Sequence, residues 1–329
     1  MVGIIILDYN NAYDTMNCIS SVMEHTPNGV YKIMVVENGS NDATLAQMTD
    51  FVNGQNEGRV YREKGAVPKN LPKLSLLISQ TNDGYAEGNN KALRLFEKDE
   101  SIDKILILNN DILFVEDIIS SLEQAMMQIP DCGIISPLLV KKDGVSIDYN
   151  CARHDYKKMQ FFWEYLFSFK NLFGIIERFE YQKKYLLNNP SLLSEPFFEI
   201  ELPSGSCMMI DKDLFKSIGY FDNHTFLYFE ENILYRKLLC IGRKNFIVPS
   251  LKCIHLGAST SQKVPSMFTM KCQMKSTSYY LKTYRNAPLL ARYVSVMSTF
   301  TIIKIWLQRK FRNMETNLNN LNNSVHEYE

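Results

Sequence analysis

The chain has 329 residues, 46% of them hydrophobic, and its 36 lysines and arginines balance its 36 aspartates and glutamates. This length accommodates one large domain, or a catalytic domain with an appendage. The zero net charge provides no general attraction to nucleic acid, so no nucleic-acid partner is expected. The seven cysteines are scattered and form no CxxC pair, which argues against a disulfide framework and a structural zinc site.

The first residues contain no basic region followed by a cleavage site, so they do not resemble a signal peptide. The most apolar long stretch, residues 289–307, is interrupted by Arg292 and Lys304. It therefore falls short of the roughly 18 uninterrupted apolar residues that a membrane-spanning helix needs. A cytoplasmic location follows as the expectation.

Short apolar runs alternate with helical patterns in the first part of the chain. This alternation predicts an α/β fold in which a mainly parallel sheet has helices on both faces. Polar clusters follow the runs, and open α/β sheets bind ligands at this edge. The runs cover residues 2–7, 32–36, 74–78 and 105–108, and helices are expected to begin near Asp14, which can cap its helix, and near Asp42 and Glu87.

The pattern changes after about residue 145. Residues 156–198 are rich in aromatic side chains and predict helices that form a lid, an acceptor-side subdomain, part of the core or a membrane-facing surface. Further along, residues 204–210 and 246–248 predict strands, and residues 229–240 predict a helix that Gly242 ends.

The last part of the chain predicts a basic amphipathic helix. Apolar residues recur at helical spacing in residues 288–312, which contain five basic residues and no acidic one. Such a helix can lie on an anionic membrane surface or dock on the catalytic domain, and the sequence leaves both interpretations open. The asparagine-rich residues 316–329 are expected to form a flexible tail.

Asp111 is the first candidate for chemistry. It follows Asn109 and Asn110 at the end of an apolar strand, so its carboxylate is expected at the ligand-binding edge of the sheet. A carboxylate there is a hard oxygen ligand for Mg²⁺ or Mn²⁺, and the ion would bridge a diphosphate. The structural alternative is an aspartate that caps a loop or begins a helix.

Glu230, Glu231 and His255 are the other candidates. Adjacent acids on a helix point in different directions, so one can face a cleft and act as a general base. The alternative is a solvated helix N-terminus, where acids are favoured in any case. His255 follows a strand-like stretch, and its imidazole can bind a metal or a phosphate or fill a structural position.

Taken together and in order, these clusters resemble the family-two glycosyltransferases with the GT-A fold. The likeness runs from residue 3 to about residue 260, and it is nearest to the rhamnosyltransferase-like and capsule or O-antigen branch. It rests on five ordered segments, which makes it more specific than any single motif. The segments are IIILDYN, VVENGSNDAT, NDGYAEGNNKAL, ILILNNDI and the stretch from LPSGSCMMI to FEENILYRKLLCIG.

The resemblance implies a donor-nucleotide site along the first three segments and the fourth strand end. Glu37 stands where the family has an acid that reads the base or ribose, and Asp8 stands where asparagine or threonine is commoner. Asn109 replaces the first aspartate of the family's DxD motif, which leaves Asp111 as the implied metal ligand. The implied donor residues are Asp8, Tyr9, Asn10, Glu37, Asn38, Ser40, Asn82, Gly84, Tyr85, Asn89, Asn109 and Asn110.

The resemblance also implies the catalytic residues. Glu231 matches the acid that serves the family as catalytic base, although an aspartate is usual there, and Glu230 matches the acid before it. His255 matches the histidine that contacts the metal or phosphate, so Asp111 and His255 would hold Mn²⁺ or Mg²⁺. Gly205 and Ser206 would lie on the acceptor side.

The implied function is inverting transfer of a sugar from a UDP- or dTDP-sugar to a saccharide in bacterial surface polysaccharide synthesis. The acceptor would be lipid-linked, which implies a place at the inner face of the cytoplasmic membrane. The expected organisation is a catalytic domain over 1–262, divided into a nucleotide half over 1–145 and an acceptor half over 146–262, then a helical segment over 263–315.

The sequence bears on two other functions. The first strand is followed by Asp-Tyr-Asn-Asn and not by GxGxxG, which argues against a dinucleotide-dependent dehydrogenase. The departures at Asp8 and Glu231 leave a second alternative, a catalytically degraded homologue that acts as a scaffold in a polysaccharide-assembly complex.

Overall fold

The computed structural model of the chain describes residues 1–171, 184–257 and 266–326, with side chains up to residue 166 in the segment before the first gap and up to residue 310 in the last helix. The chain divides into two compact units, each described by itself below. Unit 1 contains Met1–Asp155 and Gln182–Ser261, and unit 2 contains Tyr156–Tyr181 and Gln262–Glu329.

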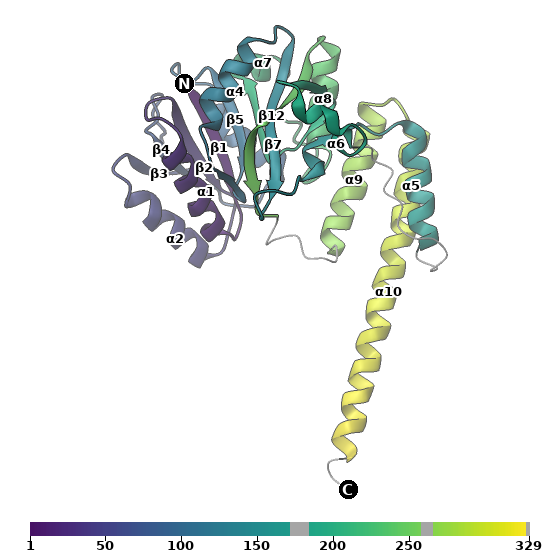
Figure 1. Cartoon of the computed structure of the whole chain (residues 1–329). Helices are drawn as coiled ribbons and strands as arrows, with labels where there is room; N and C mark the ends of the chain where they lie inside the picture. Colours follow the sequence, from purple (N-terminus) through teal and green to yellow (C-terminus); the bar gives the residue numbers. More distant parts are fainter. Residues whose placement is uncertain (172–183, 258–265, 327–329) are drawn as a thin grey trace. The chain divides into compact units, whose positions relative to one another are not determined.

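Unit 1 is built on a mixed ten-stranded sheet with the order β3-β4-β2-β1-β5-β11-β7-β12-β6, in which β9 pairs with β12 (Figure 1). Its first five strands are parallel, and β11 runs antiparallel to both of its neighbours. A small second sheet pairs β8 with β10. The strands are β1 Val2–Asp8, β2 Tyr31–Glu37, β3 Gly58–Arg62, β4 Leu74–Ile78, β5 Lys104–Asn109, β6 Ile112–Phe114, β7 Cys132–Lys141, β8 Ala152–Arg153, β9 Phe198–Ile200, β10 Leu202–Pro203, β11 Cys207–Asp211 and β12 Lys244–His255.

Helices cover both faces of this sheet because its strands are apolar on both sides. In β1, Ile4 and Ile6 pack into one core cluster and Ile5 into the other. Residues of α1, α2 and α4 fill the first cluster, and residues of α3, α7 and α8 fill the second. The helices are α1 Ala12–His25, α2 Asp42–Asn53, α3 Gly84–Phe96, α4 Ile118–Met127, α6 Tyr185–Asn188, α7 Lys212–Ser217 and α8 Glu230–Cys240, with 3-10 turns at Tyr149–Cys151 and Pro190–Ser194.

The predicted elements of unit 1 are present, and several boundaries differ. Asn11 is the N-cap position of α1, so the prediction that Asp14 caps this helix was wrong. The helix expected near Glu87 begins at Gly84. The strand expected over 246–248 continues past Pro249 to His255, because β12 shifts its register against β7 near the proline.

Unit 2 is helical and consists of α5 Lys158–Asn171, α9 Met267–Thr283 and α10 Pro288–His326. The Tyr165 hydroxyl lies 3.1 Å from Thr277 Oγ1, and the Phe162 ring stacks on Tyr293 at 4.9 Å. The first part of the aromatic segment 156–198 is therefore helical, as predicted, and its residues 172–183 lie outside the described residues.

The last helix is longer than the sequence analysis expected. α10 runs through 316–326, which was expected to be a flexible tail, and residues 327–329 lie outside the described residues. By length and composition, its part Pro288–Lys310 qualifies as a membrane span, although buried helices of soluble proteins meet the same criteria. Of the window tested, 22% is buried.

The turn between β4 and α3 leads to a testable prediction. Gly84 has a φ of +80°, and a Cβ there would lie 2.2 Å from the carbonyl oxygen of Phe226, which accepts a hydrogen bond from the Tyr85 amide at 2.9 Å. We expect Gly84→Ala to lower the free energy of unfolding by about 3 kcal/mol, measured by urea denaturation. Gly29→Ala is the control, because Gly29 has a φ of +85° and open space around it, and its loss should be only about 1 kcal/mol. Equal losses would contradict a role for the contact with Phe226.

Candidate functional site

The candidate site lies at the carboxyl ends of the parallel strands. Register pairs place Asp8 opposite Glu37 on one side of β1 and Leu7 opposite Asn109 on the other. Glu37 in turn lies opposite Ile78. The polar residues that follow these strands are therefore brought to one edge of the sheet, as the sequence predicted.

The loops after β1 and β2 hold one another through polar contacts. The Asn10 amide donates to Ser40 Oγ at 2.8 Å, and Asn10 Oδ1 accepts from the Asn41 amide at 2.9 Å. The buried Glu37 carboxylate accepts from the Ser40 amide at 2.6 Å. Tyr9 is 46% exposed beside them. Glu37 thus organises this loop, and Tyr9 offers a ring to the solvent.

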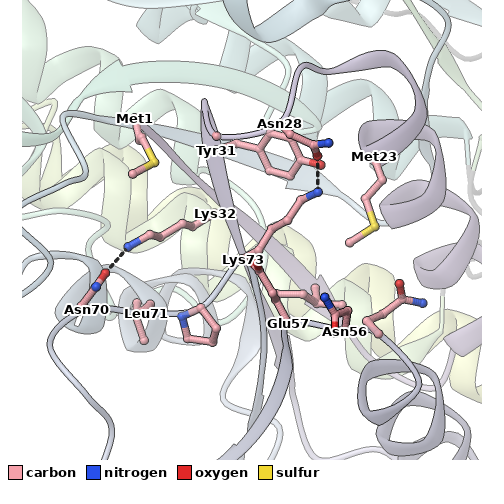
Figure 2. Close-up of a pocket in the computed structure, with 14 residues that line it drawn as sticks. Met1, Met23, Asn28, Tyr31, Lys32, Asn56, Glu57, Asn70, Leu71 and Lys73 are labelled. Atoms are coloured by element: carbon pink, nitrogen blue, oxygen red, sulfur yellow. Dashed lines mark hydrogen bonds between the residues drawn. The ribbon is translucent and has the colours of Figure 1, made fainter.

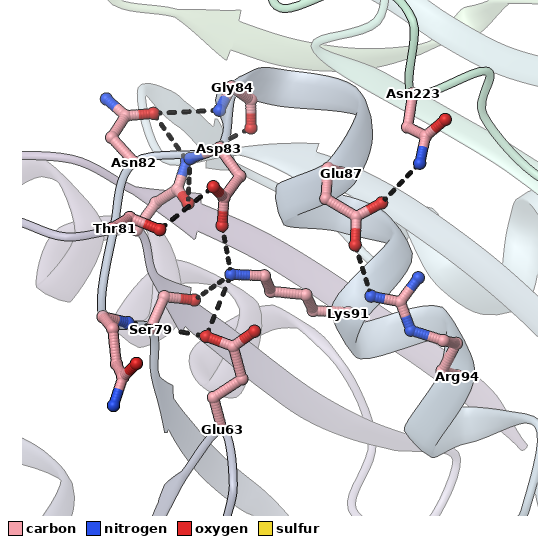
Figure 3. A network of polar contacts seen from close by, with 12 residues as sticks. Glu63, Ser79, Thr81, Asn82, Asp83, Gly84, Glu87, Lys91, Arg94 and Asn223 are labelled. Carbon is pink, nitrogen blue, oxygen red and sulfur yellow. Dashed lines mark hydrogen bonds and ion pairs between the residues drawn. The ribbon is translucent and has the colours of Figure 1, made fainter.

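A polar network fixes the turn that starts α3. Asn38 Nδ2 donates to Asn82 Oδ1 at 3.0 Å and to the Gly84 carbonyl at 3.1 Å. Beneath this turn, the buried Lys91 ammonium contacts Glu63, Ser79 and Asp83 (Figure 3). The Asp83 pKa is lowered because Lys91 hydrogen-bonds to its carboxylate. The amides that were predicted to border the nucleotide therefore also shape the loop.

Asp8 lies inside the protein. Its side chain is fully buried, and Oδ1 accepts from Thr15 Oγ1 at 2.9 Å and from Asn110 Nδ2 at 3.4 Å. Burial raises the pKa of Asp8. Its Oδ2 has no hydrogen-bond partner among the described residues. Asp8 thereby joins the end of β1 to α1 and to the turn after β5.

The antiparallel pairing of β11 with β5 brings Ser206, which the resemblance placed on the acceptor side, to this edge. The Asn109 amide donates to the Ser206 carbonyl at 2.8 Å, and Asn109 Nδ2 donates to Ser206 Oγ at 3.2 Å. Residues that are 97 positions apart in the chain therefore lie side by side at the strand ends.

Asp111 and His255 are neighbours, and a third residue joins them. His255 Nε2 lies 3.3 Å from Asp111 Oδ2, and its Nδ1 lies 2.8 Å from Asp148 Oδ2. These contacts, with Asp111 the larger cause, raise the pKa of His255 to about 9. Asp111 is buried, and its Oδ1 has no hydrogen-bond partner among the described residues. The sequence analysis paired Asp111 with His255 and missed Asp148.

Glu230 and Glu231 begin α8 after a strained backbone. Tyr228 and Phe229 have φ values of 75° and 72°, a left-handed conformation that residues with a Cβ rarely adopt. Glu230 is buried, and burial together with the nearby Glu231 raises its pKa to about 8. Its Oε1 has no hydrogen-bond partner among the described residues. Glu230 therefore holds its proton more tightly than an exposed glutamate does.

Glu231 is held by groups from two distant parts of the chain. Its Oε1 accepts from the Gly205 amide at 3.1 Å and lies 3.3 Å from the Arg153 guanidinium. The Tyr85 hydroxyl donates to the Gly205 carbonyl at 2.7 Å. A Cβ on Gly205 would lie 2.9 Å from Glu231 Oε1, so only glycine fits here without a shift.

The base of α8 is anchored by a second buried acid. Asp155 accepts from Asn232 Nδ2 at 2.8 Å and from the Arg236 guanidinium. Sequence reasoning missed Arg153, Asp148 and Asp155, which lie close together in the chain. In the sequence, these residues are marked only by the charged residues around them, which follow an apolar run. Their partners in the structure lie more than 75 positions away in the chain.

These contacts connect the predicted site residues within unit 1. Tyr85 and Glu231 meet at Gly205, the next residue Ser206 contacts Asn109, and Asp111 follows two positions later. The edge therefore combines an anchored carboxylate, a buried acid with a raised pKa and an acid–imidazole pair. This combination suits proton abstraction beside a site for a charged leaving group.

A cavity of about 640 Å³ lies at the opposite edge of the sheet (Figure 2). It is lined by residues at the amino ends of β1, β2 and β4, including Met1, Tyr31 and Lys73. Because these strands are parallel, the cavity is separated from the predicted site by the length of the strands. It contains none of the predicted site residues.

The comparisons with known proteins agree with this architecture. No protein-family model matches the chain. The chain is 24% identical over 230 residues to a curated relative, the low-salt glycan biosynthesis hexosyltransferase Agl10 of Haloferax volcanii. The matched region is 70% of this chain and 59% of the relative, so the chain spans about three-fifths of that protein's length.

The fold is shared with a solved structure of GalNAc-T7 with UDP, GalNAc and Mn²⁺. The TM-score is 0.59 at 12% identity, and the likeness covers 87% of this chain and 49% of the other. The predicted GT-A fold, with a mainly parallel sheet between helices and a helical C-terminal extension, is therefore confirmed.

The burial of Glu230 leads to a prediction about pH. Its folded-state pKa of about 8 exceeds the ordinary value of 4.5, so folding becomes less favourable as the pH rises toward 8. Between pH 6 and pH 8 the free energy of unfolding of the wild type should fall by on the order of 1 kcal/mol per pH unit relative to that of Glu230→Gln, measured by urea denaturation. Glu24→Gln, at an exposed position of α1, should follow the wild type. A Glu230→Gln variant with the wild-type pH dependence would contradict burial of an ionisable group here.

Proposed function

We propose that this chain is an inverting glycosyltransferase that moves a sugar from a UDP- or dTDP-sugar to a saccharide hydroxyl. The observation that carries the proposal is the junction at Gly205 and Ser206, which connects the Glu231 carboxylate to the strand end that bears Asp111. The GT-A fold and the similarity to a hexosyltransferase support it. The nucleotide of the neighbour, UDP, is one of the two donor classes proposed for this chain.

Glu231 is the proposed general base. The Gly205 amide and the Arg153 guanidinium both engage Oε1, which orients the carboxylate and leaves Oε2 for the acceptor hydroxyl. The hydroxyl passes its proton to Glu231 as its oxygen attacks the anomeric carbon from the face opposite the nucleoside diphosphate. The bond to the diphosphate breaks in the same step, so the anomeric configuration inverts.

Tyr85 and Glu230 are the neighbours of this carboxylate in the proposed mechanism. Burial raises the Tyr85 pKa well above its ordinary value, so the hydroxyl remains protonated and donates to Gly205. Glu230, when protonated, can donate a hydrogen bond to the acceptor sugar without adding a second negative charge. In this proposal Glu230 acts as a hydrogen-bond donor and Glu231 as the base.

Asp111 and His255 suit a divalent cation. No group of three His, Cys, Asp or Glu residues that could hold a metal ion occurs in the described part of the chain. Two protein ligands nevertheless suffice for Mg²⁺ or Mn²⁺ at a site where substrate phosphates complete the shell. The unpartnered Asp111 Oδ1 and the imidazole beside it fit such an ion. When bound, the cation would neutralise the charge that develops on the departing diphosphate.

The donor residues are proposed as the resemblance implied them. Tyr9, Asn10, Asn38, Ser40 and Asn82 lie in the loops after β1, β2 and β4. Asn89 is buried in α3 with an Oδ1 that has no hydrogen-bond partner among the described residues, which leaves an acceptor available to a ligand. Glu37 and Asp8 are buried at the ends of β2 and β1, where Glu37 accepts from the Ser40 amide and Asp8 from the Thr15 hydroxyl.

The exchange of a single carboxylate tests the proposed base. Glu231→Gln keeps the shape of the side chain but cannot take a proton, so we expect transfer to fall at least about 100-fold, measured with nucleotide-sugar donors and saccharide acceptors. Donor affinity, followed by thermal shift, should change less than about threefold. Glu24→Gln should keep the wild-type rate. Wild-type transfer by Glu231→Gln would remove this residue as the base, and a wild type that binds no nucleotide sugar would favour a scaffold.

Unit 2 is proposed to bring the enzyme to a lipid surface. One face of α10 is buried through Ala291, Val294, Ser298 and Ile302, which recur at helical spacing. The opposite face exposes large apolar side chains among basic residues. Exposed apolar residues of α10 are Leu289, Val296, Phe300, Ile303, Trp306 and Leu307, and the neighbouring basic residues are Arg292, Lys304, Arg309 and Lys310. Apolar and basic groups on one surface fit an anionic membrane interface.

This location fits a lipid-linked saccharide acceptor in surface polysaccharide synthesis, such as a capsule or O-antigen, at the cytoplasmic face of the membrane. We expect the chain to co-sediment with vesicles that contain phosphatidylglycerol and less with neutral vesicles. The double change Ile303→Ser and Leu307→Ser should weaken this binding about tenfold, because each residue exposes 40% or more of its surface. Met127→Ser, at an exposed methionine of α4, is the matched control. Equal binding to neutral and anionic vesicles, or none, would contradict this location.

A further inference from the structure

Asp148 occupies a defined position beside the proposed metal ligands. It follows β7, and its amide donates to the Leu139 carbonyl at 2.9 Å, which ties the residue to the end of that strand. Its carboxylate is 14% exposed. Oδ2 lies 2.8 Å from His255 Nδ1, and the other ring nitrogen lies 3.3 Å from Asp111. The three side chains form a row with the imidazole in the middle.

The second oxygen of Asp148 is already engaged. Oδ1 accepts from the Asn150 amide and from Asn150 Nδ2, both at 3.0 Å. Two donors on one oxygen fix the rotation of the carboxylate, so Oδ2 is directed at the imidazole. The orientation of His255 therefore depends on Asp148 and on the short turn that follows it.

We propose that Asp148 is a positioning residue that sets the tautomer of His255 for cation binding. The role rests on the metal site in the proposed function. A neutral imidazole carries its proton on one nitrogen and its lone pair on the other. Because the Asp148 carboxylate can only accept, it keeps a proton on Nδ1, so Nε2, on the side of Asp111, is the nitrogen that would release its proton to bind a cation. In other proteins, carboxylates that orient metal-binding histidines in this way raise metal affinity by about 10- to 100-fold.

Asp148→Asn is a sharp test because the two atoms of the amide are not equivalent. The two Asn150 donors require the amide oxygen at the position of Oδ1. The amide nitrogen then faces Nδ1 and donates to it, which moves the ring proton to Nε2 and blocks the lone pair that a cation needs. The substitution therefore keeps the turn and reverses the tautomer.

The experiment measures Mn²⁺ binding by electron paramagnetic resonance of the free ion, with the full chain and with UDP or dTDP present. We expect Asp148→Asn to weaken Mn²⁺ binding about 10- to 100-fold. Asp143→Asn is the matched control: Asp143 belongs to the same connection and accepts from the amides of Val145 and Ser146, at 2.9 and 2.8 Å, without touching His255. The Asp143→Asn substitution removes the same charge, and the variant should bind Mn²⁺ like the wild type.

A double-mutant cycle separates tautomer control from a simple loss of negative charge. In a His255→Ala background, Asp148→Asn should have no further effect on Mn²⁺ affinity. An effect that persists in this background, or an equal loss in Asp143→Asn, would overturn the positioning role. If Asp148→Asn binds Mn²⁺ like the wild type while His255→Ala binds it more weakly, the role of Asp148 is overturned and that of His255 stands. A wild type that does not bind Mn²⁺ would overturn the metal site itself, and with it this role, while the base assignment of Glu231 would stand.

Discussion

The antiparallel pairing of β11 with β5 is the constraint on which the rest of the site depends. Register contacts from Cys207 opposite Leu108 to Asp211 opposite Lys104 continue the sheet from its parallel half into its mixed half. The same pairing places Ser206 against Asn109 and puts Gly205 within reach of Tyr85 and Glu231. A slip of one residue would turn every β11 side chain to the other face of the sheet, so the register is strongly determined by burial.

Some of the buried polar groups that lack partners, and some of the strained backbone, belong to residues of the candidate site. Asp111, Glu230 and Asn89 each have a buried oxygen without a hydrogen-bond partner among the described residues. Tyr228 and Phe229 have left-handed backbone before the two acids of α8. Such features cost stability, and folded proteins retain them mainly where a ligand or a reaction uses them. The surrounding core offsets this cost, since both faces of the sheet are packed with buried apolar side chains.

Several strands in the first half of the chain could be predicted from the sequence, because each is recognisable from its own few residues. β1, β2, β4 and β5 are buried on both faces, so each appears as a short continuous apolar run. β7 was not among the predicted strands, and it contains Pro137 near its middle, a residue that is uncommon in central strands. β3, whose pattern alternates only weakly, was also missed.

The sequence by itself determined which polar residues follow the strands, because the alternation of strands and helices places them at one edge. It could not determine which of them contact one another. Asn38 and Asn82 were expected to border the nucleotide, and the structure shows them hydrogen-bonded to each other. Arg153 and Asp148 carry no motif, and only the folding of distant segments brings them to Glu231 and His255. Periodicity and spacing record contacts within an element, whereas these contacts depend on strand order and register across the whole sheet.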